Sequence, residues 1–271
     1  MGFWGTFVLA RSATLLANVE AVRGFGYQHE HLYELGDGWQ LLETRAPLSL
    51  GLPQASERFV AATATSVLAM RVFNSDCLRA HARTADGWST SFHVPGPADE
   101  CPHRHAEPEA PRAAGAVAAD LARWAGAGGL TPSAERLEAL VDQTAHRRWS
   151  AEGADTAPFA MLSALGLGKA DQPYPATIDL DEPVYCAIIG WHGLARKALN
   201  NAALRVDGLR DGERVSPQEP WEAAALELEA ELWAARFRAE ADTAALRQRA
   251  EQLCAQYEAM GHRRPPPWRG V

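Results

Sequence analysis

In the first hundred residues, apolar and polar positions alternate in short runs that are separated by turn residues. A period of two is typical of strands with one buried face, so the pattern predicts an antiparallel sheet. Two helix-period runs are expected within this region, near residues 12–22 and 57–63. The six predicted strands cover residues 3–10, 31–35, 39–44, 67–73, 77–83 and 88–94.

The tripeptide Asp-Gly-Trp occurs twice between such runs, at residues 37–39 and 86–88. Asp-Gly is a strong hairpin signal because glycine accepts the positive φ of a tight turn. In the second hairpin, a two-residue loop would mix polar and apolar side chains on both faces, whereas a three-residue loop at 85–87 separates them. The apolar face then holds Leu78, Ala80, Ala82, Trp88, Thr90, Phe92 and Val94. The polar face, which we expect to be an outer, solvated face, holds Arg79, His81, Arg83, Ser89, Ser91 and His93.

The same loop rule at residues 36–38 places four apolar side chains of the first hairpin on one face: Tyr33, Leu35, Trp39 and Leu41. Both tryptophans of the repeated tripeptide, Trp39 and Trp88, are therefore predicted to face the core. A segment rich in proline, acidic residues and histidine follows at residues 95–111 and is typical of a loop or linker.

Beyond this linker the pattern is mainly helical. Helices are predicted at residues 112–125, 131–141 and 159–165, and the run at 184–189 fits either a strand or the start of a helix that continues to residue 202, which we favour. A capping box at Ser216–Glu219 opens a long amphipathic helix at about 217–260, with Asp242 on its apolar seam as a candidate break. The sequence thus predicts an α+β protein: an antiparallel sheet domain with flanking helices at residues 1–110, and a mainly helical region at 111–271 that ends in the long helix.

Charge and composition exclude some classes of function. The chain has 271 residues and a formal net charge of −8, which argues against a nucleic-acid-binding surface. No apolar run reaches membrane-spanning length, and no basic n-region with a cleavage site opens the chain, so we expect a cytoplasmic protein. The four cysteines (Cys77, Cys101, Cys186 and Cys254) form no CxxC pair, which is typical of free thiols in a reducing compartment.

No strong catalytic or cofactor motif is present. His29-Glu30-His31 lacks the spacing of a zincin, Gly166–Ala170 departs from a phosphate loop, and Gly24-Phe25-Gly26 lacks the third glycine of a dinucleotide fingerprint.

Two sets of polar residues are candidates for a site. Arg79, His81, Arg83 and His93 share the polar face of the second hairpin and suit an anionic ligand or an acidic partner. Histidine and cysteine also supply zinc ligands, although the neighbouring arginines disfavour a cation. The candidate zinc ligands are His81, His93, Cys101, His103 and His105.

Some segments carry a resemblance to a known family. Residues 1–11, the Asp-Gly-Trp-Gln-Leu-Leu-Glu run at 37–43, Val-Phe-Asn-Ser-Asp-Cys at 72–77 and the segment 121–130 resemble a family of uncharacterised cytoplasmic proteins from GC-rich Gram-positive bacteria. The likeness extends over about the first 165 residues. It implies a compartment and an organisation, and no activity, cofactor or catalytic residue comes with it.

We therefore expect a non-catalytic binding or interaction protein, such as an accessory or immunity-type factor, with no cofactor. Its partner would be a protein, a peptide or an anionic small molecule, without nucleic acid or membrane, and the terminal helix would allow a homo-oligomer. One alternative is an enzyme that modifies a small molecule or peptide in an anion-accepting pocket lined by arginine and histidine. The other is a zinc metalloprotein.

Overall fold

The computed structural model describes residues 2–45, 51–94, 101, 103, 105, 112–142, 154–170, 172–176, 191–206, 219–238 and 242–264. The chain forms two compact units, the first made of residues 1–26 and 30–174 and the second of residues 27–29 and 175–271. The boundary expected near residue 110 therefore lies inside the first unit, because the helices that follow it belong with the sheet.

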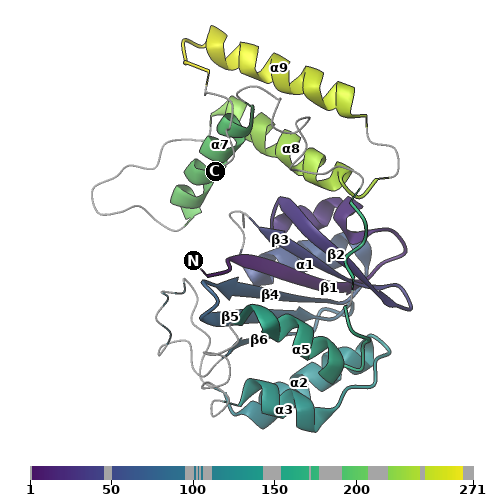
Figure 1. The fold of residues 1–271 in the computed structure, drawn as a ribbon. Helices are drawn as coiled ribbons and strands as arrows, with labels where there is room; N and C mark the ends of the chain where they lie inside the picture. Colours follow the sequence, from purple (N-terminus) through teal and green to yellow (C-terminus); the bar gives the residue numbers. More distant parts are fainter. Residues whose placement is uncertain are drawn as a thin grey trace. The chain divides into compact units, whose positions relative to one another are not determined.

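A six-stranded sheet is the centre of the first unit (Figure 1). Its strands lie in the order β2-β3-β1-β4-β5-β6, and every pair whose register is described is antiparallel, as the alternating pattern predicts. The strands are β1 (Gly5–Arg11), β2 (Gln28–Gly36), β3 (Trp39–Arg45), β4 (Val67–Phe73), β5 (Cys77–Arg83) and β6 (Ser89–Val94).

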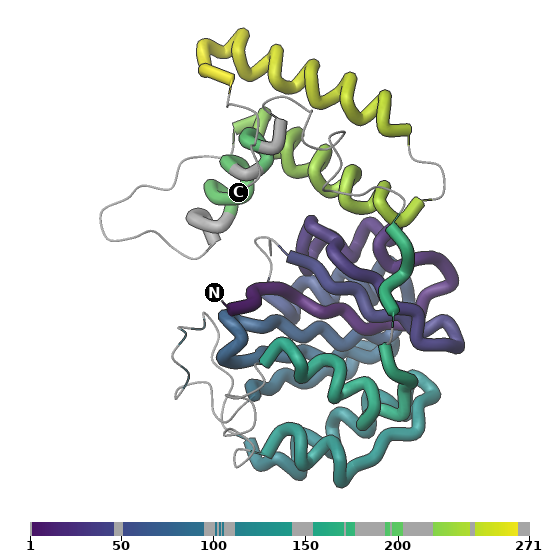
Figure 2. The backbone as a smooth tube through the Cα atoms, in the orientation of Figure 1, coloured from purple at the N-terminus to yellow at the C-terminus, as the bar shows by residue number. Residues whose placement is uncertain are grey.

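Helices cover both faces of this sheet. The helix α1 (Leu52–Thr63) packs on β4, on β5 and on the 3-10 helix η2 (Glu20–Gly24), which follows η1 (Leu16–Asn18). These two short 3-10 helices replace the single helix expected at 12–22, because Val19 between them is extended. The opposite face carries α2 (Ala114–Ala127), α3 (Ala134–Val141), η5 (Ala154–Thr156) and α5 (Ala157–Ala164), which the chain enters after β6 (Figure 2).

The hydrophobic core lies between the sheet and α2, α3 and α5. Trp124 of α2 is fully buried, and its ring meets that of Trp39 edge-on at a centroid distance of 5.7 Å. Trp88 is partly buried against the same core, under the Arg123 guanidinium. The expectation that both tryptophans of the repeated tripeptide face the core is confirmed.

The register of the second hairpin and the side-chain faces of the first agree with the sequence. Arg83 pairs with Ser89 across β5 and β6, which leaves a loop whose Gly87 has a φ of +92°. In the first hairpin, Tyr33 and Leu35 pack against the core cluster that contains Trp39 and Leu41. Alternation and loop length were therefore sufficient to assign the faces.

The polar face of β5 and β6 differs from the sequence expectation in one respect. It is not a solvated outer face, because only 4% of His81 and 9% of His93 are exposed. The helix α1 packs on β5 from this side, so several polar side chains of the sheet are enclosed.

The second unit contains α7 (Trp191–Val206), α8 (Pro220–Ala235) and α9 (Thr243–Ala259), which pack against one another. The segment expected to be helical at 217–260 is interrupted near Asp242, the residue that the sequence marks as a candidate break. It is two helices, because Asp242 caps a new N-terminus, where its side chain accepts a hydrogen bond from Ala245 N at 2.9 Å. The capping box described at the start of α8 is Glu219 with Glu222. Both the box predicted at 216–219 and the run at 184–189 extend outside the described residues.

Among the described residues, no helix combines the length and the apolar character needed to cross a bilayer.

Candidate metal centre

The tight turn between β4 and β5 positions the first residue of the site. Asn74 and Ser75 have φ angles of 53° and 60°, and Asp76 N donates to Phe73 O at 2.9 Å. The residues just before β1 anchor this turn, since Phe3 N donates to Ser75 Oγ at 2.8 Å and Ser75 N donates to Phe3 O at 3.0 Å. Cys77, which pairs with Phe73, therefore begins β5 in a fixed position.

His93 comes from the neighbouring strand. It lies opposite Arg79 in the β5–β6 ladder, and Arg79 is two residues along β5 from Cys77. Side chains two residues apart share a face, and diagonal neighbours across an antiparallel pair are about 7–8 Å apart at their Cα atoms. The Cys77 thiol and the His93 imidazole can therefore meet on the polar face.

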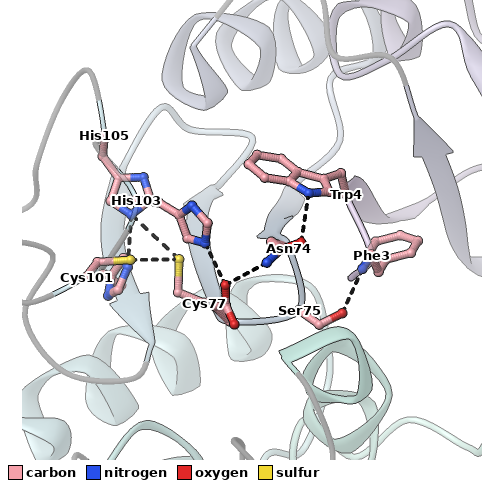
Figure 3. A network of polar contacts seen from close by, with 10 residues as sticks. Phe3, Trp4, Asn74, Ser75, Cys77, Cys101, His103 and His105 are labelled. Atoms are coloured by element: carbon pink, nitrogen blue, oxygen red, sulfur yellow. Dashed lines mark hydrogen bonds and ion pairs between the residues drawn. The ribbon is translucent and has the colours of Figure 1, made fainter. Parts of the chain in front are cut away.

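The other two residues come from the segment after β6. Cys101 and His105 both turn toward the sheet, and their side chains reach the end of β5 (Figure 3). The His105 ring meets the Phe73 ring edge-on at a centroid distance of 4.7 Å and lies 5.0 Å from the His93 ring. The site is thus assembled from two strands and one loop segment.

Four potential ligand atoms converge in this cluster, which consists of Cys77, His93, Cys101 and His105. One atom from each residue lies within 4.8 Å of the three others. The two sulfur atoms are 3.0 Å apart, Cys77 Sγ is 3.6 Å from His105 Nε2, and the Nε2 atoms of His93 and His105 are 3.2 Å apart. Two thiols and two imidazoles form a donor set typical of structural zinc.

The protonation states of the cluster follow from its burial. Burial lowers the pKa of His105 to about 4, and the positive charges of His93, Arg79 and His103 add to this effect. The imidazole is therefore neutral at pH 7, which is the form that binds a metal. Burial, together with the hydrogen bond and the charge of Cys101, raises the pKa of the Cys77 thiol. Without a cation, Cys77 therefore retains its proton.

His103 does not join the cluster, although the sequence places it among the candidate ligands. Its Nε2 lies 2.9 Å from Asp76 Oδ2, and its ring meets the exposed Trp4 edge-on at 5.4 Å (Figure 3). The hydrogen bond from Asn74, and then the contact with His103, lower the pKa of Asp76. His103 therefore ties the segment to the β4–β5 turn from outside the cluster.

His81 also lies outside the cluster. It is four residues from Cys77 on the same strand, which is about 13 Å at the usual rise per residue. Its Nδ1 lies 2.7 Å from Ser91 Oγ, across the ladder. Burial first, then Arg83 and Arg79, lower the pKa of His81 to about 4.

The anion-binding set predicted from the sequence shares one sheet face but is divided among different partners. His93 belongs to the cysteine–histidine cluster, and His81 contacts Ser91. The Arg83 guanidinium lies 3.9 Å from a carboxylate oxygen of Glu57 on α1. Arg79, which is half-buried, lies beside the cluster, and its positive charge acts to lower the pKa of both Cys77 and His105.

A second group of possible ligands lies on β2 and β3 and consists of Glu30, His31 and Glu43. Arg45 occupies this group as a cation, with its Nε 2.8 Å from Glu30 and a guanidinium nitrogen 3.9 Å from Glu43. His31 Nδ1 lies 3.1 Å from Glu43. The group is therefore an ion-pair network at the sheet surface.

Cys77 is the cluster residue that was not among the zinc ligands predicted from the sequence. The signal was present, because residue 77 has the same strand parity as Arg79 and His81 and so falls on the polar face that carries His93. His93, Cys101 and His105 were among the predicted ligands, and the structure brings these three together with Cys77.

Comparisons with known proteins give no further assignment of the site. The chain matches no protein-family model, no curated protein and no solved structure. The donor set and its geometry are therefore the basis for a functional assignment.

Proposed function

We propose that this protein binds one Zn²⁺ through Cys77, His93, Cys101 and His105, and that the ion has a structural role in a non-catalytic binding protein. The observation that carries the proposal is the convergence of four zinc-type donor atoms within 4.8 Å of one another. Two come from adjacent strands, and Cys101 follows the last of these, His93, by eight residues, so their approach is not a consequence of local sequence.

The distances between donor atoms fit a tetrahedral ion. With bonds of about 2.3 Å to sulfur and about 2.0–2.1 Å to nitrogen, tetrahedral angles place two nitrogens about 3.3 Å apart and a sulfur about 3.6 Å from a nitrogen. The corresponding separations here are 3.2 Å between the imidazoles and 3.6 Å between Cys77 and His105. Three of the four residues thus need little movement to bind zinc.

The charge of Arg79 is compatible with this proposal. In the sequence, the neighbouring arginines disfavour a cation site. However, two thiolates and two neutral imidazoles around Zn²⁺ have a total charge of zero, so the loaded centre does not repel the guanidinium. Arg79 also favours the thiolate form of Cys77, since its charge lowers the pKa of that thiol against the effect of burial.

Four protein ligands fill the tetrahedral shell, which is the arrangement of structural zinc, whereas catalytic zinc keeps a position for water. The ion would join β5, β6 and the segment that precedes α2. This supports the expectation of a non-catalytic protein, in which the metal shapes a surface and does no chemistry. The partner, a protein, a peptide or an anionic small molecule, stays a prediction.

Metal binding by two matched histidine variants tests the proposal. We expect the purified full chain to contain about one zinc per molecule, and cobalt substitution to give the absorption of a tetrahedral thiolate site. His105→Gln should lose metal affinity by more than about 100-fold, because loss of an outer-shell partner alone costs about 10- to 100-fold. His103→Gln, in the same segment but outside the cluster, should retain the metal.

Two results would contradict the proposal. One is a full chain that takes up no stoichiometric zinc or cobalt after reduction. The other is an equal loss of affinity in His103→Gln and His105→Gln, because that would indicate disruption of the segment and not removal of a ligand.

A further inference from the structure

The two cysteines of the cluster lie closer together than two zinc ligands do. Their sulfur atoms are 3.0 Å apart, whereas tetrahedral zinc–sulfur bonds of about 2.3 Å would place them about 3.8 Å apart. A disulfide bond is about 2.05 Å long. The sulfur–sulfur distance is therefore intermediate between that of two zinc ligands and that of a disulfide. The two sulfurs would need to approach by about 1 Å to form the disulfide bond.

We propose that Cys77 and Cys101 are a reversible thiol–disulfide pair, and that oxidation of this pair and zinc binding exclude each other. The second half of this inference rests on the proposed zinc site. The oxidant would be a low-molecular-weight disulfide such as glutathione disulfide. The cluster would then have two states, a metal-bound dithiolate and a metal-free disulfide.

Burial decides which sulfur reacts first. Cys77 is 1% exposed, whereas Cys101 is only partly buried. The Cys101 thiolate therefore attacks one sulfur of the small disulfide, forms a mixed disulfide and releases one thiolate. Cys77 then gives its proton to the first released thiolate, and its sulfur attacks Cys101 Sγ and displaces the second small thiolate. The two protons of the protein thiols go to the two released thiolates, and the two electrons reduce the small disulfide to two thiols.

Competition with zinc follows from the same sulfur atoms. A thiolate is a zinc ligand, and both thiolates are consumed when the disulfide forms. His93 and His105 alone would then remain, which are too few ligands for a structural site. Conversely, a zinc ion that binds both thiolates removes the nucleophile that starts the exchange. In a reducing compartment such disulfides are typically transient and redox-sensing.

The experiment exposes the full chain, zinc-loaded or metal-free, to glutathione disulfide and follows the cysteines by peptide mass spectrometry. We expect a Cys77–Cys101 disulfide in the metal-free protein, formed at least about tenfold faster than in the zinc-loaded protein. Zinc released to a chromophoric chelator should match the disulfide formed. Cys254→Ser, which removes the buried cysteine of α9, is the matched control and should behave as the wild type.

The outcomes separate this inference from the proposed function. If the protein binds zinc but Cys101 stays as a mixed disulfide or pairs with another cysteine, the inference fails and the zinc site stands. If the Cys77–Cys101 disulfide forms in a protein that binds no zinc, the zinc site fails and the thiol pair is supported. Equal rates of oxidation with and without bound zinc would overturn the exclusion. Cys101→Ser should abolish the disulfide, and any Cys77–glutathione adduct in it would contradict the order of attack.

Discussion

His81 illustrates how one buried side chain responds to its neighbours. It pairs across the ladder with Ser91, its Nδ1 lies 2.7 Å from Ser91 Oγ, and only 4% of the residue is exposed. Burial is the main cause that lowers its pKa to about 4, and the positive charges of Arg83 and Arg79 act in the same direction. His81 is therefore a neutral, structural residue at pH 7.

This lowered pKa predicts a pH-dependent stability. The unfolded chain takes up a proton near pH 6.5, whereas the folded chain resists it down to about pH 4. The contribution of His81 is thus fully present above pH 6.5 and is lost as the pH falls toward 4, by about 2 kcal/mol between pH 7 and 4.5. We expect His81→Gln to lack this loss, which urea unfolding of the metal-free proteins at both pH values measures. An equal loss in both proteins would show that His81 does not titrate in this way.

At the residue level, strand parity explains what the sequence could predict. Alternation places His93 on the polar face and gives the same face to Cys77. Alternation cannot show whether the segment after β6 contacts Cys77 or His81, because both side chains lie on the polar face. Cys101, His103 and His105 lie in a proline-rich stretch with no periodicity, so only their tertiary contacts distinguish them. Cys101 meets Cys77 and His105 meets His93, whereas His103 pairs with Asp76.

At the level of elements, the end of α2 depends on a close approach to the sheet. Gly128 caps this helix, and a Cβ atom there would lie 2.8 Å from Trp39 Cζ2 and 3.0 Å from Trp39 Cη2. Gly126, one position before the last residue of the helix, has no atom within 4 Å of such a Cβ. The two glycines thus have different roles, although they are two residues apart.

These glycines form a matched pair of variants. Gly128→Ala should lower the free energy of unfolding by about 1–3 kcal/mol, because Trp39 is held in the core and must move. Gly126→Ala should raise it by about 0.5–1 kcal/mol, because alanine is the better helix former and meets no obstacle. Chemical denaturation of both variants beside the wild type measures the two signs. A gain in stability for Gly128→Ala would mean that the helix does not end against Trp39.

Elements differ in how far the sequence determined them. Strand faces followed from the period of two, although β1 begins two residues later and β2 three residues earlier than expected, and the three-residue loop gave the pairing of Arg83 with Ser89. The continuity of the terminal helix did not follow, because the 4-3 spacing of Trp221, Ala225 and Leu228 resumes beyond Asp242, and the polar residue on the seam only marked a candidate break. The spacing of apolar residues shows which face of a helix is buried, but it does not show whether the helix is continuous. The hydrogen bond from Ala245 N to Asp242 determines where α9 begins.

At the scale of the whole molecule, the division into units follows from tertiary packing. The core of the first unit combines strand residues such as Phe7 and Phe92 with Leu121, Leu137 and Leu162 of α2, α3 and α5. A proline-rich linker such as the segment before α2 typically marks a boundary in sequence, yet here the helices beyond it complete the sheet core. All four cluster residues also belong to the first unit.

Because the proposed zinc site lies in one unit, zinc should protect the chain unevenly. A ligand that binds only the folded state stabilises by about 4 kcal/mol at 1,000 times its Kd, which is about a 1,000-fold change in the opening equilibrium. In hydrogen-exchange mass spectrometry of the full chain, zinc should slow exchange in peptides from β5 and β6 by up to this factor, and peptides from α8 and α9 should not change. Cys101→Ser should remove the response in β5 and β6. If α8 and α9 were protected to the same degree as the sheet, the two units would open as one cooperative structure, and the stabilising effect of the ion would extend beyond the unit that binds it.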